Sequence, residues 1–172
     1  APNATPEQAA ARRRREQLEE QRAAAQVCER QYAEASRALR DAWDVLPQRP
    51  EIARRDTETL TRALLDKMLV DGEMAVRLLT TQSGDRATAH ALNVTVISLL
   101  MGRTFGFTTE EMLDLGVGAL LHDVGKLELP DRLRHLDEHF TSAEASSYRE
   151  HVALGVAQGR RLVLSPGTQL VL

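Results

Sequence analysis

Leu120-Leu121-His122-Asp123-Val124-Gly125-Lys126 is the stretch that decides how this sequence is interpreted, because an apolar helical run ends there in two metal-binding side chains. An imidazole nitrogen and a carboxylate oxygen together suit zinc, iron or manganese, and a carboxylate can bridge two metal ions. Adjacent helical residues point about 100° apart, so His122 and Asp123 reach one metal only where the helix ends or is distorted. Gly125, which accepts a positive φ, and Pro130 predict that ending. The alternative interpretation is a capping cluster with an exposed lysine.

Lys126 is one of two lysines in the chain, and arginines supply the other basic side chains. Its compact ammonium group suits a phosphate oxygen beside a metal. Phosphodiester hydrolysis needs a nucleophile at neutral pH and neutralisation of negative charge, and paired metals supply both. No side-chain nucleophile is required, so the lack of an obvious Ser/His/Asp or Cys/His arrangement does not weaken the interpretation.

Three of the five histidines are candidate metal ligands: His90, His122 and His151. We predict that His90 opens an apolar helix over residues 91–105. His151 falls inside a helix, and Gly155 one turn later is predicted to clear space beside its ring for a second metal or a substrate. Taken singly, each histidine is more often an ordinary helical residue than a ligand. The other two, His135 and His139, lie in a polar connection and are predicted to be at the surface.

The order and spacing of these residues resemble the HD superfamily of metal-dependent phosphohydrolases, and within it the HD-GYP class. The resemblance covers residues 85–172. Its most specific part is the string His-Asp-x-Gly-Lys-x-x-x-Pro at residues 122–130, with His90 before it and Glu144 and His151 after it. The resemblance implies an all-α fold, an HD-domain helical bundle preceded by long N-terminal helices.

The resemblance also implies roles for five residues. His90, His122 and Asp123 would hold one metal, while Asp123 would bridge to a second metal held by His151. Lys126 would contact the scissile phosphate. Similar proteins hydrolyse the bacterial second messenger cyclic di-GMP to pGpG and often on to GMP, using two divalent transition-metal ions, commonly iron or manganese. Zinc also fits these ligands.

The chain departs from the HD-GYP pattern in one respect. The His-His pair, the Gly-Tyr-Pro motif and a late aspartate ligand are not found in the 172 residues. We therefore expect a truncation before the Gly-Tyr-Pro motif and an incomplete active site, in which the second metal has only Asp123 and His151 as protein ligands. The ending Ser165-Pro166-Gly167 followed by an apolar run predicts the first turn of another helix.

Good helix formers dominate the sequence and alternating strand patterns are absent, which predicts an all-α protein. We predict helices over residues 7–46, 52–82, 109–122 and around His151. Capping boxes mark two of their starts, Thr108 with Glu111 and Thr141 with Glu144. Gly116 and Gly118 predict a close helix crossing. The resulting division is a helical linker or regulatory segment over residues 1–50, a helix leading into the bundle over 51–84, and the front part of an HD-GYP-type catalytic domain over 85–172.

The first helix contains a thin apolar stripe, suited to a linker or a partner contact: Val27, Gln31, Ala35, Ala38, Ala42 and Val45. Its run Arg12-Arg13-Arg14-Arg15 is followed at once by glutamates, which predicts a solvated face and not a nucleic-acid site. In the second helix the apolar positions are predicted to be packing residues: Leu60, Leu64, Met68, Met74, Leu78 and Leu79.

Composition favours a cytoplasmic protein. The net charge of −3 gives no broad attraction to nucleic acid or to an anionic membrane. No apolar stretch approaches the roughly 20 residues that span a bilayer, and no secretory signal is recognised. Cys28 is the single cysteine, so no disulfide within the chain is possible.

The leading functional hypothesis is a cyclic di-GMP phosphodiesterase. The alternatives are an HD phosphohydrolase acting on another nucleotide, and a catalytically inactive HD-type signalling module that binds partners through its N-terminal helices. Expected partners are cyclic di-GMP, a second copy of the chain through its helices, and other signalling proteins.

Overall fold

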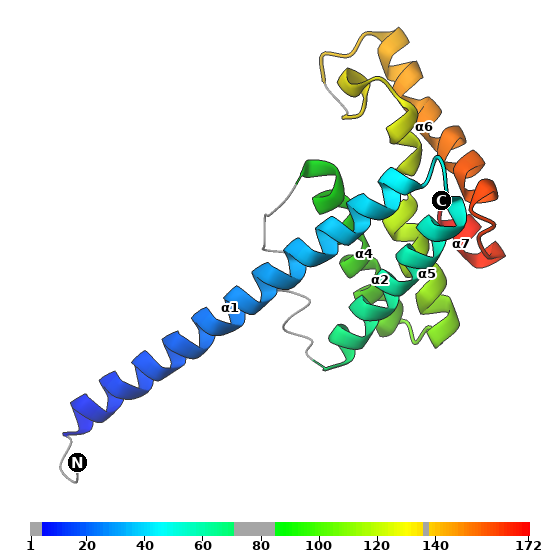
Figure 1. Ribbon diagram of the computed structural model, residues 1–172. Coiled ribbons are helices and arrows are strands. Elements are labelled where there is room, and N and C mark those ends of the chain that lie inside the picture. The colour runs from blue at the N-terminus through cyan, green and yellow to red at the C-terminus, as the bar shows by residue number, and fades with distance from the viewer. Residues whose placement is uncertain (1–4, 71–84, 136–137) are drawn as a thin grey trace.

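All regular secondary structure in the described residues is helical, which confirms the predicted all-α class. The computed structural model describes residues 5–70, 85–135 and 138–172. Its α-helices and 3₁₀ helices follow one another as α1 (Pro6–Val45), α2 (Pro50–Val70), α4 (Arg86–Thr104), α5 (Thr109–Leu121), η1 (Val124–Glu128), η2 (Asp131–Leu133), α6 (Ser142–Arg161) and α7 (Pro166–Val171). Figure 1 shows α1 reaching far beyond the body formed by the other helices.

Local sequence signals account for several helix starts. Thr108 and Thr141 each accept a hydrogen bond from the backbone N–H three residues later, and the glutamate at that position accepts one from the threonine N–H. Both predicted capping boxes are therefore confirmed. The predicted helix after Ser165 is also present, with Pro166 in its first turn and the Ser165 hydroxyl as its cap.

Two helices begin earlier than predicted. The helix predicted over residues 91–105 begins earlier, at Arg86, because the carboxylate of Asp85 accepts hydrogen bonds from the N–H groups of Ala87 and Thr88. His90 therefore lies inside α4 and does not open it. The helix predicted over residues 52–82 begins at Pro50 and is described to Val70. The positions Met74, Leu78 and Leu79 lie outside the described residues.

The second half of α1 belongs to the hydrophobic core. Its buried side chains are Cys28, Tyr32, Ser36, Leu39, Ala42 and Trp43. The thin apolar stripe predicted for this helix was incomplete: Ala42 is buried and Ala35 and Val45 pack against the core, but the stripe omitted the large inward-facing side chains Tyr32, Leu39 and Trp43. They join the core formed by Leu60 and Leu64 of α2 and by the buried leucines of α4 and α5. A fully buried leucine stabilises a fold by about 1.5–3 kcal/mol.

Helix α5 is the central element, and its glycines allow close approach on two sides. A Cβ atom at Gly116 would overlap Thr61 of α2. A Cβ atom at Gly118 would overlap the side chain of Val171 in α7. The predicted close crossing at these two glycines is confirmed, and it fixes the end of α5 from which the His122-Asp123 segment extends.

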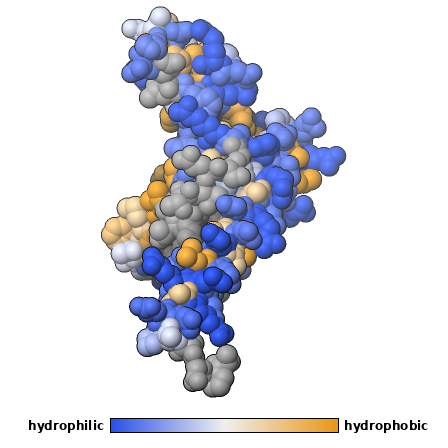
Figure 2. All heavy atoms as spheres, turned by 90° about the vertical axis from the view of Figure 1, so that its left-hand side faces the viewer, coloured by the Kyte–Doolittle hydropathy of each residue, from blue (hydrophilic) through white to orange (hydrophobic). Residues whose placement is uncertain are grey.

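The surface seen in Figure 2 is mainly hydrophilic, with hydrophobic side chains gathered in separate patches. Exposed apolar residues on α4 include Ile97 and Met101, and Phe105 follows its end. Across residues 5–70, 85–135 and 138–172, no helix is both long and apolar enough to pass through a bilayer.

Candidate metal centre

The helix ends where the motif requires it. α5 stops at Leu121, His122 still has helical dihedral angles, and Asp123 departs from them with φ −104° and ψ 8°. This change turns two adjacent side chains toward each other, so that His122 Nε2 lies 3.2 Å from Asp123 Oδ2. The predicted termination of the helix at His122-Asp123 is confirmed.

Gly125 has a different role from the one predicted. It does not adopt a positive φ, since among the described glycines only Gly106 does. A Cβ atom at Gly125 would instead overlap the carbonyl of His151 and the amide nitrogen of Gly155. The backbone of η1 therefore lies directly against the backbone of α6, and only glycine fits between them.

The space beside Gly155 is also filled by protein. A Cβ atom at Gly155 would meet the amide nitrogen of Gly125 at 3.7 Å and the carbonyl oxygen of His122 at 3.9 Å. The prediction that Gly155 clears room for a metal or substrate was wrong, because that room holds the backbone of the motif itself. Gly125 allows the contact that brings His151 of α6 to the motif, whereas at Gly155 an added Cβ would make only ordinary van der Waals contacts.

The three predicted imidazole ligands lie around the fourth predicted ligand, the carboxylate of Asp123. The ligand atoms of His90, His122 and Asp123 lie within 4.8 Å of one another. Oδ2 of Asp123 is 3.6 Å from His90 Nε2, whereas Oδ1 is 3.7 Å from His151 Nε2. Asp123 thus stands between two imidazoles on one side and a third on the other, an arrangement suited to a bridging carboxylate.

Backbone carbonyls orient two of the imidazole rings. Nδ1 of His122 donates to the carbonyl oxygen of Ala119 at 2.7 Å, and Nδ1 of His151 donates to the carbonyl oxygen of Tyr148. A carbonyl can only accept, so both rings carry a proton on Nδ1, and Nε2 is the atom turned toward Asp123. Metal-binding histidines are commonly held by such a second hydrogen bond.

The charges at the site favour an ionised carboxylate. Burial raises the pKa of Asp123, but hydrogen bonds from His122 and Lys126 outweigh it and hold that pKa well below its usual range. Burial lowers the pKa of His90, which keeps its imidazole neutral and able to coordinate. Burial also lowers the pKa of His122, but the Asp123 carboxylate outweighs this effect and raises it overall.

Lys126 lies at the edge of this cluster. Its Nζ donates to Asp123 Oδ2 at 2.7 Å and lies 5.2 Å from the centroid of the Tyr148 ring. Burial lowers the pKa of Lys126, but the contact with Asp123 outweighs it, so the side chain stays cationic. Tyr148 also packs against His151, with ring centroids 4.7 Å apart. Sequence reasoning missed Tyr148, although its position one helical turn before His151 was a usable signal.

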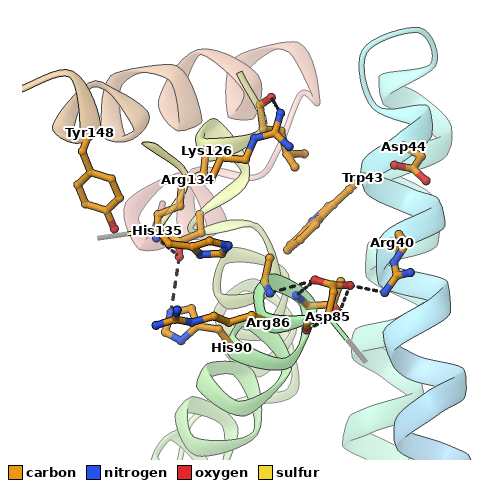
Figure 3. A pocket seen from close by; sticks show the side chains of 14 residues that line it. Arg40, Trp43, Asp44, Asp85, Arg86, His90, Lys126, Arg134, His135 and Tyr148 are labelled. Atoms are coloured by element: carbon orange, nitrogen blue, oxygen red, sulfur yellow. Dashed lines mark hydrogen bonds and ion pairs between the residues drawn. The ribbon is translucent and has the colours of Figure 1, made fainter. Parts of the chain in front are cut away.

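A cavity of about 640 Å³ opens beside the cluster. One end is lined by His90, Asp123 and Lys126, and the other by Arg40 and Trp43 of α1. Figure 3 shows Trp43 extending from α1 toward the cavity, with Lys126 and Tyr148 on the opposite side. The predicted exposure of His135 is confirmed, and this histidine also lines the cavity. Sequence reasoning gave no role in the site to Arg40, Trp43, Arg86 or Arg134.

The donor set fits a divalent transition metal. Two imidazole nitrogens and one carboxylate oxygen converge, and such nitrogen and oxygen ligands suit zinc, iron and manganese. The carboxylate of Asp123 is ionised and the imidazole of His90 is kept neutral, which are the states that coordination requires. The residues present therefore fit the metal that the motif implies.

Comparisons with known proteins agree with this geometry. No match was found among curated proteins or among solved structures. The model of the HD domain family matches residues 88–166, a segment that contains His90, His122, Asp123, Lys126 and His151. This match supports the HD superfamily of metal-dependent phosphohydrolases for that part of the chain.

Proposed function

We propose that this chain carries the ligands of a metal-dependent phosphodiesterase site, with residues 85–172 as the catalytic part and residues 1–84 as a helical regulatory part. The observation that supports it best is the position of Asp123, with His90 and His122 at one oxygen and His151 at the other. In this proposal His90, His122 and Asp123 hold one metal ion, and Asp123 and His151 face a second.

The chain's own groups would prepare the site for a phosphate ester. Asp123 is ionised and hydrogen-bonded to Lys126, so it would supply negative charge where the cations bind. Backbone carbonyls already hold the rings of His122 and His151, so these rings would not have to reorient to bind metal. Lys126 also lines the cavity and would donate to a phosphate oxygen. Bound divalent ions supply a nucleophile at neutral pH and neutralise phosphate charge.

We propose cyclic di-GMP as the substrate, which implies a role in bacterial signalling. The motif resemblance supports it, and the cavity volume lies within the roughly 300–1,000 Å³ typical of small-molecule sites. Another nucleotide phosphate remains the alternative within the same superfamily. A cytoplasmic location and contacts of α1 with a second copy or another signalling protein stay predictions.

The direct test is metal binding to the 172-residue chain. Isothermal titration with Mn²⁺ should give one clear site in the unmodified protein, and Asp123→Ala should abolish it. Asp41→Ala, which removes an exposed carboxylate from α1, is the matched control and should bind like the unmodified chain. Equal Mn²⁺ binding by the Asp123 variant would reject the metal centre.

Turnover should be measured in the same preparations. Cyclic di-GMP is incubated with Mn²⁺-loaded protein, and the products are separated by chromatography. Linear pGpG from the unmodified chain, absent with Asp123→Ala, supports the phosphodiesterase. Absence of both metal and turnover would favour an inactive signalling module, whereas hydrolysis of a different nucleotide phosphate alone would favour the second enzyme.

A further inference from the structure

The cavity continues well past the metal ligands. From His90 and Asp123 it extends to Arg40 and Trp43 on α1, a helix outside the matched segment 88–166. A single phosphate group occupies only a small part of such a volume. The shape therefore suits a ligand that reaches from the metal centre to the N-terminal helix.

Most charged side chains around the cavity already have partners. Asp85 caps α4 and pairs with Arg40. Arg134 donates to the carbonyl oxygens of Leu127 and Leu129 and pairs with Asp131. These groups shape the wall but offer little unused hydrogen-bonding capacity to a ligand.

Arg86 is different. Its side chain is exposed and lines the cavity, and within the described part of the chain it makes no hydrogen bond or ion pair. It lies one helical turn before His90, and Figure 3 shows the two side chains next to each other. Lys126 and Arg86 both act on His90 electrostatically, so cations from two different elements stand near the same imidazole.

We infer that Arg86 is a substrate-binding residue that holds a second anionic group, so the preferred substrate carries two separated phosphates. This inference rests on the proposed function, in which Lys126 contacts the reacting phosphate. An arginine fork matches two phosphate oxygens, which gives selectivity for a phosphate at that position. The rest of the ligand lies toward Trp43 and Arg40.

The chain contains its own probe of this cavity, because Trp43 is the single tryptophan. Tryptophan emission and equilibrium dialysis should be followed with cyclic di-GMP, which has two phosphates, and with GMP, which has one, in the presence of Mn²⁺. Hydrolysis to pGpG leaves both phosphates in the ligand, and chromatography of each sample checks that no further cleavage to GMP has occurred. A saturable emission change with cyclic di-GMP is expected.

Arg86→Gln should weaken cyclic di-GMP binding about tenfold, the effect of losing one charge-assisted hydrogen bond, and GMP binding by less than about threefold. Arg37→Gln, an exposed α1 arginine outside the cavity lining, is the matched control and should change neither affinity. Arg86→Lys should recover part of the loss, because it restores the charge without the fork.

The outcomes separate this inference from the proposed function. Loss of Mn²⁺ binding in Asp123→Ala together with unchanged cyclic di-GMP affinity in Arg86→Gln would overturn the role of Arg86 and leave the metal centre standing. An equal loss for GMP and cyclic di-GMP would assign Arg86 to the reacting phosphate and overturn the second subsite. The absence of any emission change in the unmodified chain would overturn the cavity as the binding site.

Discussion

The motif region and the first half of α1 show two opposite ways of holding a helix in place. Around His122-Asp123, the backbones of η1 and α6 touch through Gly125 and Gly155, and polar groups are tied to carbonyls or to one another. In α1, most side chains before Val27 are exposed, and local pairs such as Arg12 with Glu16 support the helix. Tight packing is therefore concentrated where side chains must converge.

The strongest test of this contrast is Gly125→Ala. The added methyl group would overlap the backbone of α6, which cannot move aside as a flexible side chain does. We expect the variant to lose more than about 4 kcal/mol of unfolding free energy, or to separate α6 from η1 and lose Mn²⁺ binding. Chemical denaturation and isothermal titration measure the two effects.

The control for that variant is Gly106→Ala. Gly106 has φ +75° and no atom within 4 Å of an added Cβ, so only backbone strain opposes the change. It should cost about 1–2 kcal/mol and leave Mn²⁺ binding intact. Similar losses of stability and metal binding in both variants would show that the close backbone contact has no special role.

The features that the sequence predicts and those that it does not predict differ in the same way, between local signals and tertiary contacts. Short-range signals were sufficient for the capping boxes at Thr108 and Thr141, the end of α5 and the helix after Ser165, because each depends on residues within one turn. The imidazoles and the carboxylate were identified by type and order. Their convergence is a tertiary fact that spacing alone does not determine.

The errors have two physical causes. Gly125 was interpreted from its own backbone freedom, whereas its place in the fold depends on the backbone of α6 that lies against it. In α1, alanines and arginines on all sides obscured the inward face, so Tyr32 and Trp43 were overlooked. The backbone contact at Gly125 is a long-range feature that no local pattern records, whereas the inward face of α1 recurs every three to four residues, at Cys28, Tyr32, Ser36, Leu39 and Trp43.

A smaller effect should distinguish the two halves of α1 themselves. Leu39 is 0% exposed and lies in the core, whereas Leu18 is 44% exposed in the outer half. Leu39→Ala should lower the unfolding free energy by about 2–4 kcal/mol, and Leu18→Ala by less than about 0.5 kcal/mol. Denaturant unfolding monitored by circular dichroism compares them. Equal losses would mean that the outer half of α1 is packed in solution.

The smallest expected effect concerns Asp85, which joins the packed half of α1 to α4 through Arg40. Burial raises the pKa of Asp85, but hydrogen bonds from Thr88 and the charge of Arg40 outweigh it, so the pKa is lower in the folded state than in the unfolded state. A lowered carboxyl pKa stabilises the fold above the unfolded value, about 3.9, and this stability is lost as the pH falls through the folded value.

Asp85→Asn isolates that contribution, because asparagine keeps an oxygen that can cap α4 but does not titrate over this pH range. The carboxylate is more than one third exposed, so solvent screening limits its effect to below about 1 kcal/mol. The unmodified chain should be slightly more stable than the variant near pH 7, and the difference should shrink as the pH falls below about 3.9, the pKa of the unfolded state. A difference that stays constant from pH 7 to pH 3 would mean that the charge of Asp85 does not connect α1 to the domain and that only the cap matters.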